Sequence, residues 1–173
     1  MASLPRRIVL TGAESTGKTT LAVALAKHYG IPGIPEFARE YAESRGGVLT
    51  IADAEPIAVG QLALEQSLGA VESAVLDTDL LSTWIYARYY YQWAPDWIDH
   101  YLRKSPADLY LLCDTDLAWV PDPIRDSGAS RIQVDRRFRE ELASRSLPMA
   151  VITGFDDDRL QAAIAAVERA AVR

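Results

Sequence analysis

The feature that most constrains this chain is the segment Gly12-Ala13-Glu14-Ser15-Thr16-Gly17-Lys18-Thr19, which has the pattern Gly-x-x-x-x-Gly-Lys-Thr. It follows the short β-branched run Ile8 to Thr11 and precedes a segment of helical period, Thr19 to Tyr29. A strand, a glycine-rich turn and a helix in this order are typical of a phosphate-binding loop, or P-loop. The chain is therefore expected to fold around a site for nucleotide phosphates.

Each residue type in the loop has a chemical task. Glycines let backbone N–H groups turn toward phosphate oxygens, and the helix N-terminus adds partial positive charge. Lys18 supplies a catalytic point charge, and the hydroxyl of Thr19 is a ligand for Mg²⁺. The motif predicts ATP and Mg²⁺ as cofactors, although it does not distinguish ATP from GTP. The predicted nucleotide-binding residues are Gly12, Glu14, Ser15, Thr16, Gly17, Lys18, Thr19 and Thr20.

Apolar runs alternate with segments of helical period along the chain, which predicts an α/β fold with a mainly parallel sheet. Strands are expected at Ile8–Thr11, Ile34–Pro35, Ala74–Asp77, Leu109–Cys113 and Met149–Thr153. Helices are expected at 19–29, 36–44, 50–65, 80–93, 95–103, 133–144 and 156–172. The expectation is one P-loop NTPase domain over 1–173, with helices on both faces of a five-stranded sheet and ligands at the carboxyl ends of the strands.

Composition limits the possible partners and location. With 173 residues, 49% of them hydrophobic, the chain can bury the core of one domain. Its 18 Lys+Arg against 24 Asp+Glu give a net charge of −6, which disfavours binding to nucleic acid. The single Cys113 cannot form an internal disulfide and fits a reducing compartment. No signal peptide or membrane span is recognisable near the start, so a cytoplasmic location is expected.

Two acids follow the third expected strand, and either can serve the metal. A P-loop enzyme needs a carboxylate at the end of a neighbouring strand to hold hydrated Mg²⁺. Asp77 is the candidate for this metal-binding and catalytic role, and Asp79 is the candidate for binding substrate. Aspartates at strand ends are also common turn residues. The sequence leaves open which of the two meets the metal.

Glu36 directly follows the second expected strand and can face the acceptor. A carboxylate there can take the proton of an acceptor hydroxyl as a general base. It can equally do no more than complement the N-terminus of its own helix. Arg39, one helical turn later, is expected to pair with Glu36 or to bind phosphate, with a solvated helix face as the alternative.

A loop over about 114–131 is predicted to form a lid that bears arginines. Closing such a loop brings a guanidinium to the charge that develops on a transferred phosphoryl group and excludes water. Arg125 is the first candidate for this catalytic role. Arg136 and Arg137, next to Glu140 and Glu141, are expected to form surface ion pairs instead.

Taken together, the chain resembles the ribosylnicotinamide kinase domain of the bifunctional NadR-type proteins of bacterial NAD synthesis. The P-loop alone indicates only nucleotide binding, whereas the ordered set of segments is narrower. After Gly12 to Thr19, these segments are Pro35-Glu36-Phe37-Ala38-Arg39, Ile57-Ala58-Val59-Gly60-Gln61, Asp77-Thr78-Asp79, Thr83-Trp84, Pro95-Asp96-Trp97-Ile98, Asp108-Leu109-Tyr110-Leu111-Leu112 and Trp119-Val120-Pro121-Asp122-Pro123-Ile124-Arg125.

The resemblance implies that ATP, with Mg²⁺, phosphorylates the ribose 5′-hydroxyl of nicotinamide riboside to give nicotinamide mononucleotide. This substrate has a flat cationic ring, which stacks on aromatic faces. Phe37, Tyr41 and Trp84 are candidates for that contact, with ordinary packing as the alternative. Two rival functions remain: a kinase of the same fold for another nucleoside or small metabolite, and a nucleotide-switched regulatory ATPase. An acceptor-side carboxylate and an arginine lid favour a kinase.

The chain also departs from the family pattern. Ala13 stands where a proline is frequent, and Pro121 and Pro123 flank Asp122 where an Asp-Asp-Gly turn is common. No nucleotidyltransferase signature precedes the P-loop. The chain is therefore expected to carry out the kinase step alone or as one half of a split system. The oligomeric state is not predicted.

Overall fold

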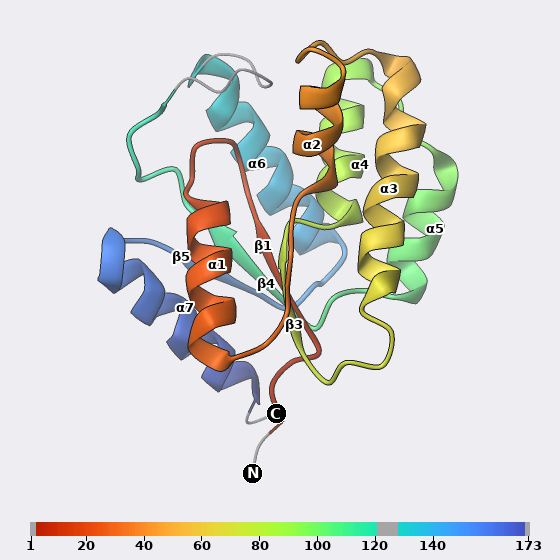
Figure 1. The fold of residues 1–173 in the computed structure, drawn as a ribbon. Helices are drawn as coiled ribbons and strands as arrows, with labels where there is room; N and C mark the ends of the chain where they lie inside the picture. Colours follow the sequence, from red (N-terminus) through yellow and green to blue (C-terminus); the bar gives the residue numbers. More distant parts are fainter. Residues whose placement is uncertain (1–2, 121–127, 172–173) are drawn as a thin grey trace.

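A five-stranded sheet forms the centre of the structure, a computed structural model that describes residues 3–120 and 128–171. All neighbouring strands pair in parallel, in the order β2-β3-β1-β4-β5 (Figure 1). The predicted parallel sheet of five strands is confirmed. The strands are β1 (Arg7–Thr11), β2 (Gly33–Ile34), β3 (Ala74–Asp77), β4 (Leu109–Cys113) and β5 (Met149–Ile152).

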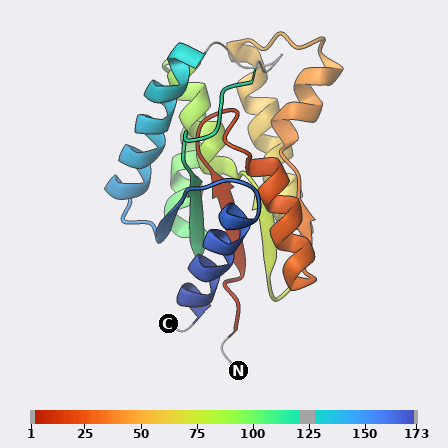
Figure 2. The ribbon, with the colours of Figure 1, turned by 90° about the vertical axis from the view of Figure 1, so that its left-hand side faces the viewer.

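Helices cover both faces of this sheet, as the sequence predicts (Figures 1 and 2). One face carries α1 (Lys18–Tyr29) and α7 (Asp156–Ala171). The other carries α3 (Ala54–Ser67), α4 (Leu80–Tyr91), α5 (Asp96–Lys104) and α6 (Gly128–Ser144). Helix α2 (Phe37–Ser44) packs on α3, and a short 3₁₀ turn, η1 (Ile51–Asp53), precedes α3. None of the described helices has the length and apolar character needed to cross a membrane.

The strands alternate their side chains between two apolar layers. In β1, Ile8 and Leu10 pack on the side of α1 and α7, whereas Val9 packs on the side of α3 to α6. All three residues have no exposed surface. A parallel sheet covered on both faces needs apolar residues at successive positions, because both sides of each strand are buried. This explains the nearly continuous apolar runs in the sequence.

The start of α6 differs from the prediction. The helix begins at Gly128 rather than at 133, so the last part of the expected lid is helical. The buried side chains of Arg131 and Val134 hold this first turn against the domain. Such tertiary contacts override the weak helix propensity of glycine and serine. Residues 121–127, the rest of the later half of the expected lid, lie outside the described part of the chain.

Gly60 allows α2 and α3 to approach closely. A Cβ atom at position 60 would lie 2.1–2.5 Å from three ring atoms of Phe37. The backbone N–H of Phe37 also donates a hydrogen bond to Gln61 Oε1 at 3.1 Å. These contacts fix the start of α2, and with it the adjacent Glu36.

The Gly60→Ala substitution is expected to destabilise the protein by about 1–3 kcal/mol, because the added methyl group overpacks the contact with Phe37. Without that contact, alanine inside a helix would stabilise by up to about 1 kcal/mol. Denaturant unfolding measures the sign of the change. Gly33→Ala is the control, since its Cβ would make only an ordinary 3.5 Å contact with Ala26. A more stable Gly60→Ala variant would contradict the close packing of α2 on α3.

Candidate active site

The turn from β1 to α1 has the backbone of a phosphate cradle. Gly12 and Gly17 have φ angles of 124° and 73°, in the region that favours glycine. A Cβ atom at Gly12 would lie 2.8 Å from the carbonyl oxygen of Cys113, so β4 leaves no space for a side chain there. Lys18 is the first residue of α1. The loop therefore places a lysine at a helix N-terminus, where anions bind.

Two side chains close this loop on itself. Lys18 Nζ and Thr16 Oγ1 both donate hydrogen bonds to the carbonyl oxygen of Ala13, at 2.6 and 2.8 Å. Lys18 is buried, so its ammonium group has little access to water. A phosphate oxygen is a stronger acceptor for an ammonium group than a neutral carbonyl. Lys18 can therefore exchange Ala13 for a nucleotide phosphate.

Asp77 lies beside this loop, at the end of β3. The hydroxyl of Thr19 lies close enough to its carboxylate to lower its pKa. Burial raises the pKa of Asp77 above its usual value, and the charge of Glu36 raises it further. The Thr19 hydroxyl and the charges of Lys18 and Arg39 oppose this rise. The residues predicted for metal, phosphate and acceptor thus form one electrostatic cluster.

Thr19 and Asp77 form a donor set that suits Mg²⁺. Mg²⁺ is commonly held by one or two carboxylates together with substrate phosphates and water. Thr19 is exposed at the start of α1, and Asp77 supplies the carboxylate oxygen. The described residues contain no group of three or more His, Cys, Asp or Glu side chains placed to hold a metal. The arrangement fits an ion shared with a nucleotide better than an all-protein cage.

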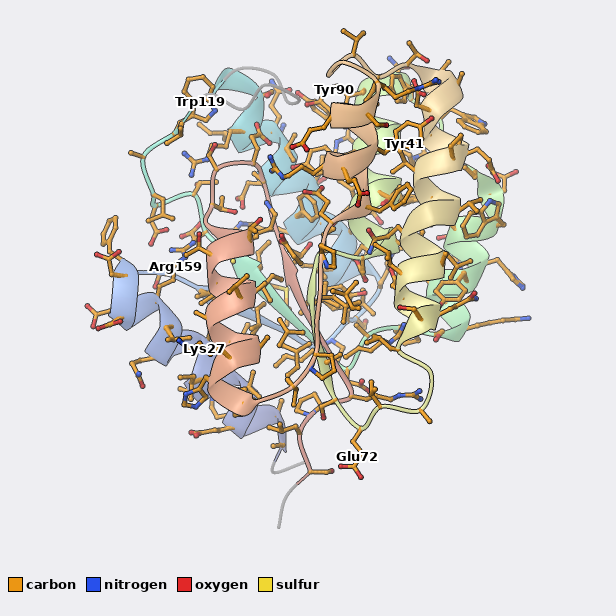
Figure 3. The ribbon with its side chains drawn as sticks, in the orientation of Figure 1. Lys27, Tyr41, Glu72, Tyr90, Trp119 and Arg159 are labelled. Atoms are coloured by element: carbon orange, nitrogen blue, oxygen red, sulfur yellow. The ribbon has the colours of Figure 1, made fainter. Side chains whose placement is uncertain are left out.

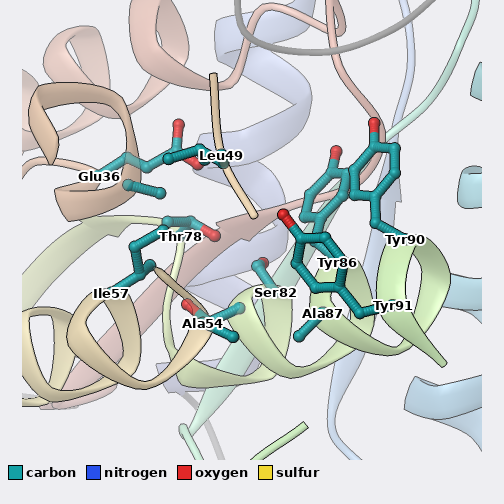
Figure 4. Close-up of a pocket in the computed structure, with 12 residues that line it drawn as sticks. Glu36, Leu49, Ala54, Ile57, Thr78, Ser82, Tyr86, Ala87, Tyr90 and Tyr91 are labelled. Atoms are coloured by element: carbon teal, nitrogen blue, oxygen red, sulfur yellow. The ribbon is translucent and has the colours of Figure 1, made fainter. Parts of the chain in front are cut away.

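A cavity of about 290 Å³ lies between α2, α3 and α4, and we call it the acceptor pocket (Figure 4). Glu36 borders it from the start of α2, and Ile57 from α3. Helix α4 contributes Tyr86, Tyr90 and Tyr91. The rings of Tyr86 and Tyr90 are stacked, with centroids 6.1 Å apart and planes 12° from parallel. The pocket thus combines aromatic surface with a carboxylate.

The three aromatic residues expected from the sequence lie elsewhere. Phe37 packs on Gly60, and the hydroxyl of Tyr41 donates to Asp53 Oδ1 at 2.9 Å. Trp84 lies outside the acceptor pocket, with the guanidinium carbon atoms of Arg88 and Arg145 5.1 and 4.9 Å from its ring centre. The predicted contacts of Phe37, Tyr41 and Trp84 with substrate stay predictions that this geometry does not support.

Sequence reasoning missed the tyrosines that do line the pocket. Tyr86 and Tyr90 are four residues apart, and Ser82 and Thr83 lie one turn earlier on the same side of α4. Residues three or four apart share one face of a helix. Trp84 does not fit this spacing with Tyr86 and Tyr90. The spacing was therefore the signal that could have identified the pocket tyrosines within a run of aromatic residues that otherwise resembles core packing.

Glu36 is buried and faces this pocket. It occupies the N-cap position of α2, yet its side chain makes no cap hydrogen bond. Its Oε2 atom lies 3.9 Å from Nη2 of Arg39, whose side chain is 42% exposed. The position at the wall of the acceptor pocket favours the general-base interpretation over capping. The pairing of Glu36 with Arg39 agrees with one of the two roles expected for that arginine.

Asp79 is occupied by structural contacts. Its Oδ1 accepts hydrogen bonds from the N–H groups of Leu81 and Ser82, at 3.0 and 3.4 Å, and caps α4. Its Oδ2 accepts one from the Tyr110 hydroxyl at 2.7 Å. Asp77, and not Asp79, therefore faces the P-loop. A contact between Asp79 and substrate stays a prediction, and the geometry describes a helix cap.

Glu65 lies beneath the same helix cap. Its Oε1 atom accepts a hydrogen bond from the N–H of Leu80 at 2.9 Å, and its Oε2 atom lies 3.8 Å from Arg7. Burial, together with the negative charge of Asp79, raises the pKa of Glu65 to about 8. The turn between β3 and α4, which presents Asp77, thus rests on two buried carboxyl groups.

Arginines approach the P-loop from two directions. Arg131 in α6 donates to the carbonyl oxygen of Ser15 at 3.1 Å. Arg159 in α7 donates to the carbonyl oxygens of Thr16 and Asp114, both at 3.0 Å. Arg159 was missed, because an arginine in the first turn of a helix gives no sequence signal for such a contact. Arg125, the predicted lid arginine, lies outside the described residues.

Glu14 connects the P-loop with the acceptor pocket. It is buried, and its Oε2 atom accepts a hydrogen bond from the hydroxyl of Tyr86 at 3.3 Å. Its Oε1 atom accepts one from Ser130 at 3.4 Å. A single carboxylate of the phosphate cradle is thereby bonded to α4 and α6. The pocket and the cradle are therefore joined through this side chain.

Comparisons with known proteins place the chain in a family and support its fold. A family model described as an AAA domain matches residues 7–159. The trifunctional NAD biosynthesis/regulator proteins NadR of Salmonella typhimurium and Escherichia coli are each 28% identical to the chain over 146 residues. The match covers 79% of this chain and 34% of each relative. The chain is homologous to NadR and spans about a third of the length of these relatives.

Solved structures show the same fold. A NadR protein in complex with NAD and AMP-PNP has a TM-score of 0.72 at 24% identity, over 98% of this chain and 51% of that one. A deoxyadenosine kinase from M. mycoides has a TM-score of 0.67 at 11% identity, over 94% and 99% of the two chains. The fold is therefore that of P-loop kinases, as the sequence predicts.

The raised pKa of Glu65 predicts a pH dependence of stability. The folded protein binds the Glu65 proton more tightly than the unfolded chain does. The free energy of unfolding therefore falls as pH rises from about 4.5 to about 8. Glu65→Gln removes this loss. Its melting temperature relative to the parent is expected to be higher at pH 8.5 than at pH 6. Glu72→Gln is the control, because Glu72 is exposed to solvent. It also lies at the other end of the structure from Tyr90 of the acceptor pocket (Figure 3). Equal differences at both pH values would contradict a protonated Glu65.

Proposed function

The chain belongs to the AAA-domain family, and we propose that it is an ATP- and Mg²⁺-dependent kinase that phosphorylates the 5′-hydroxyl of nicotinamide riboside to nicotinamide mononucleotide. One observation carries the proposal: a pocket of tyrosines and a carboxylate lies beside a phosphate cradle that presents Lys18. The relationship to P-loop kinases supports the reaction class. The tyrosine rings and the carboxylate of the pocket support nicotinamide riboside as the acceptor.

The acceptor pocket suits a flat cation. Tyrosine faces attract cations through the negative potential of their rings. Tyr86 and Tyr90 present such rings, and the hydroxyl of Tyr86 donates to the buried carboxylate of Glu14. Glu36 adds a second carboxylate at the wall. The nicotinamide ring of the riboside is flat and positively charged, so both features favour it over a neutral base of similar size.

The nucleotide half of the site would bind and orient the phosphates. Lys18 would leave Ala13 for the nucleotide, and Thr19 and Asp77 would hold the metal. Mg²⁺, when bound, neutralises charge on the phosphates. On the acceptor side, Glu36 would accept the proton of the 5′-hydroxyl while the oxygen of that hydroxyl forms the new bond to phosphorus. The bond from phosphorus to the leaving ADP breaks in the same transfer, and the proton later passes from Glu36 to water.

The relatives add independent support. One solved NadR structure is described as a complex with NR, and its TM-score to this chain is 0.72 at 24% identity. The curated NadR proteins are named for NAD biosynthesis. The chain spans about a third of the length of these trifunctional proteins. The proposal for this chain is therefore limited to a kinase step.

Acceptor dependence tests the reaction directly. Consumption of ATP is expected to require added nicotinamide riboside, with a product of the mass of nicotinamide mononucleotide. Lys18→Ala is expected to abolish turnover while the protein stays folded, because a P-loop lysine acts on the charge of the transition state. ATP hydrolysis that ignores every acceptor would indicate a nucleotide switch. Phosphorylation of a neutral nucleoside alone would replace the proposed acceptor.

Glu36→Gln is expected to lower kcat by about 10²–10⁴, the usual contribution of general-base catalysis, with nearly unchanged ATP binding. Loss of a charge near a helix N-terminus would instead reduce stability by about 0.3–1 kcal/mol and spare turnover. Measuring kcat and melting temperature on one variant separates the two roles. Glu40→Gln, at an exposed position of the same helix, is the matched control. A Glu36→Gln enzyme within a few-fold of the parent would remove Glu36 from the mechanism.

A further inference from the structure

Thr78 holds an unfavourable backbone conformation. It links β3 to α4 and has a φ angle of 83°. This left-handed region is uncommon for residues other than glycine, and a β-branched residue there is an outlier. The N–H of Thr78 donates to the carbonyl oxygen of Leu10 at 3.1 Å, which ties the residue to β1. Glycine would relieve the strain, so the side chain of Thr78 needs a reason to be present.

The Thr78 hydroxyl has no hydrogen-bond partner among the described residues. Thr78 is 3% exposed, and its Oγ1 atom is buried without a hydrogen bond to any described residue. Most buried polar atoms in proteins have at least one partner, and each exception needs an explanation. Valine would fill the same space without an unpaired oxygen. Neither the fold nor packing therefore accounts for threonine at this position.

The location of Thr78 supplies an explanation. It lies in the wall of the acceptor pocket, between Glu36 and Ser82 (Figure 4). Ser82 already shares a hydrogen bond with Thr11, with 3.2 Å between the two hydroxyl oxygens. Thr78 thus supplies this wall with a buried hydroxyl that lacks a partner within the described protein. A ligand in the pocket would lie against it.

We propose that Thr78 is a specificity-determining residue whose hydroxyl forms a hydrogen bond with a sugar hydroxyl of the acceptor. The inference rests on the proposed function, in that the acceptor is a nucleoside bound in this pocket. Its flat base would stack on Tyr86 and Tyr90, and its 5′-hydroxyl would meet Glu36. The sugar joins these two groups and would therefore pass along the wall at Thr78. This contact would give the Thr78 hydroxyl the partner that it lacks among the described residues.

Two substitutions separate recognition from structure. Thr78→Val keeps the shape and β-branching but removes the unpaired oxygen, so the free protein is expected to melt at or above the parent temperature. Affinity for the nucleoside is expected to fall about three- to tenfold, the effect of one hydrogen bond. Thr78→Ser keeps the hydroxyl and is expected to bind the nucleoside within about twofold of the parent. ATP affinity is expected to be the same in all three proteins.

Calorimetric titration with nicotinamide riboside, adenosine and cytidine provides the test. The nucleoside that the parent binds most tightly is then used for the variants. A Thr78→Val protein that keeps its nucleoside affinity, or that melts several degrees lower, would overturn the role of Thr78. If the parent binds adenosine or cytidine but not nicotinamide riboside, the proposed acceptor is wrong, whereas the test of Thr78 still proceeds. If the parent binds no nucleoside, both proposals fall.

Discussion

The parallel pairing of β1 with β3 is the constraint on which the site depends. In this register Leu10 lies opposite Asp77, and the carbonyl oxygen of Leu10 accepts a hydrogen bond from the N–H of Thr78. Both strands therefore end at the same level, β1 in the phosphate cradle and β3 in an acidic turn. A shift in register would separate Thr19 from Asp77, whose carboxylate is stabilised by the Thr19 hydroxyl.

The two halves of the site are built by different means. The nucleotide half is made largely of backbone, with glycine conformations and the start of α1 fixing where phosphate can bind. The acceptor half is made of side chains on one face of α4, opposite α2 and α3. Glu14 joins the halves through the hydroxyl of Tyr86. The cradle has the backbone typical of P-loop proteins, whereas the proposed acceptor would be selected by a few residues of α4 and by the turn before it.

The strands, most helix boundaries and the P-loop could be predicted because their signals are local: apolar runs, glycine and proline breaks, and one motif of fixed spacing. The positions of Asp77 and Glu36 near the P-loop could be predicted because parallel strands end at one edge of a sheet, whereas their roles stay predictions. The partners of Asp79, the orientation of Trp84 and the contact of Arg159 with Thr16 could not. Each depends on which elements pack together in three dimensions, and the sequence around each residue is equally suited to a surface or a core position.

In the proposed reaction, the γ-phosphoryl group passes from a nucleotide in the cradle to a riboside in the acceptor pocket. The most direct measurement uses ATP labelled with oxygen-18 in the γ-phosphoryl group, followed by mass spectrometry of the products. All the labelled γ-phosphoryl oxygens are expected to appear in nicotinamide mononucleotide. Label that appears only in inorganic phosphate, at a rate unaffected by the riboside, would contradict it.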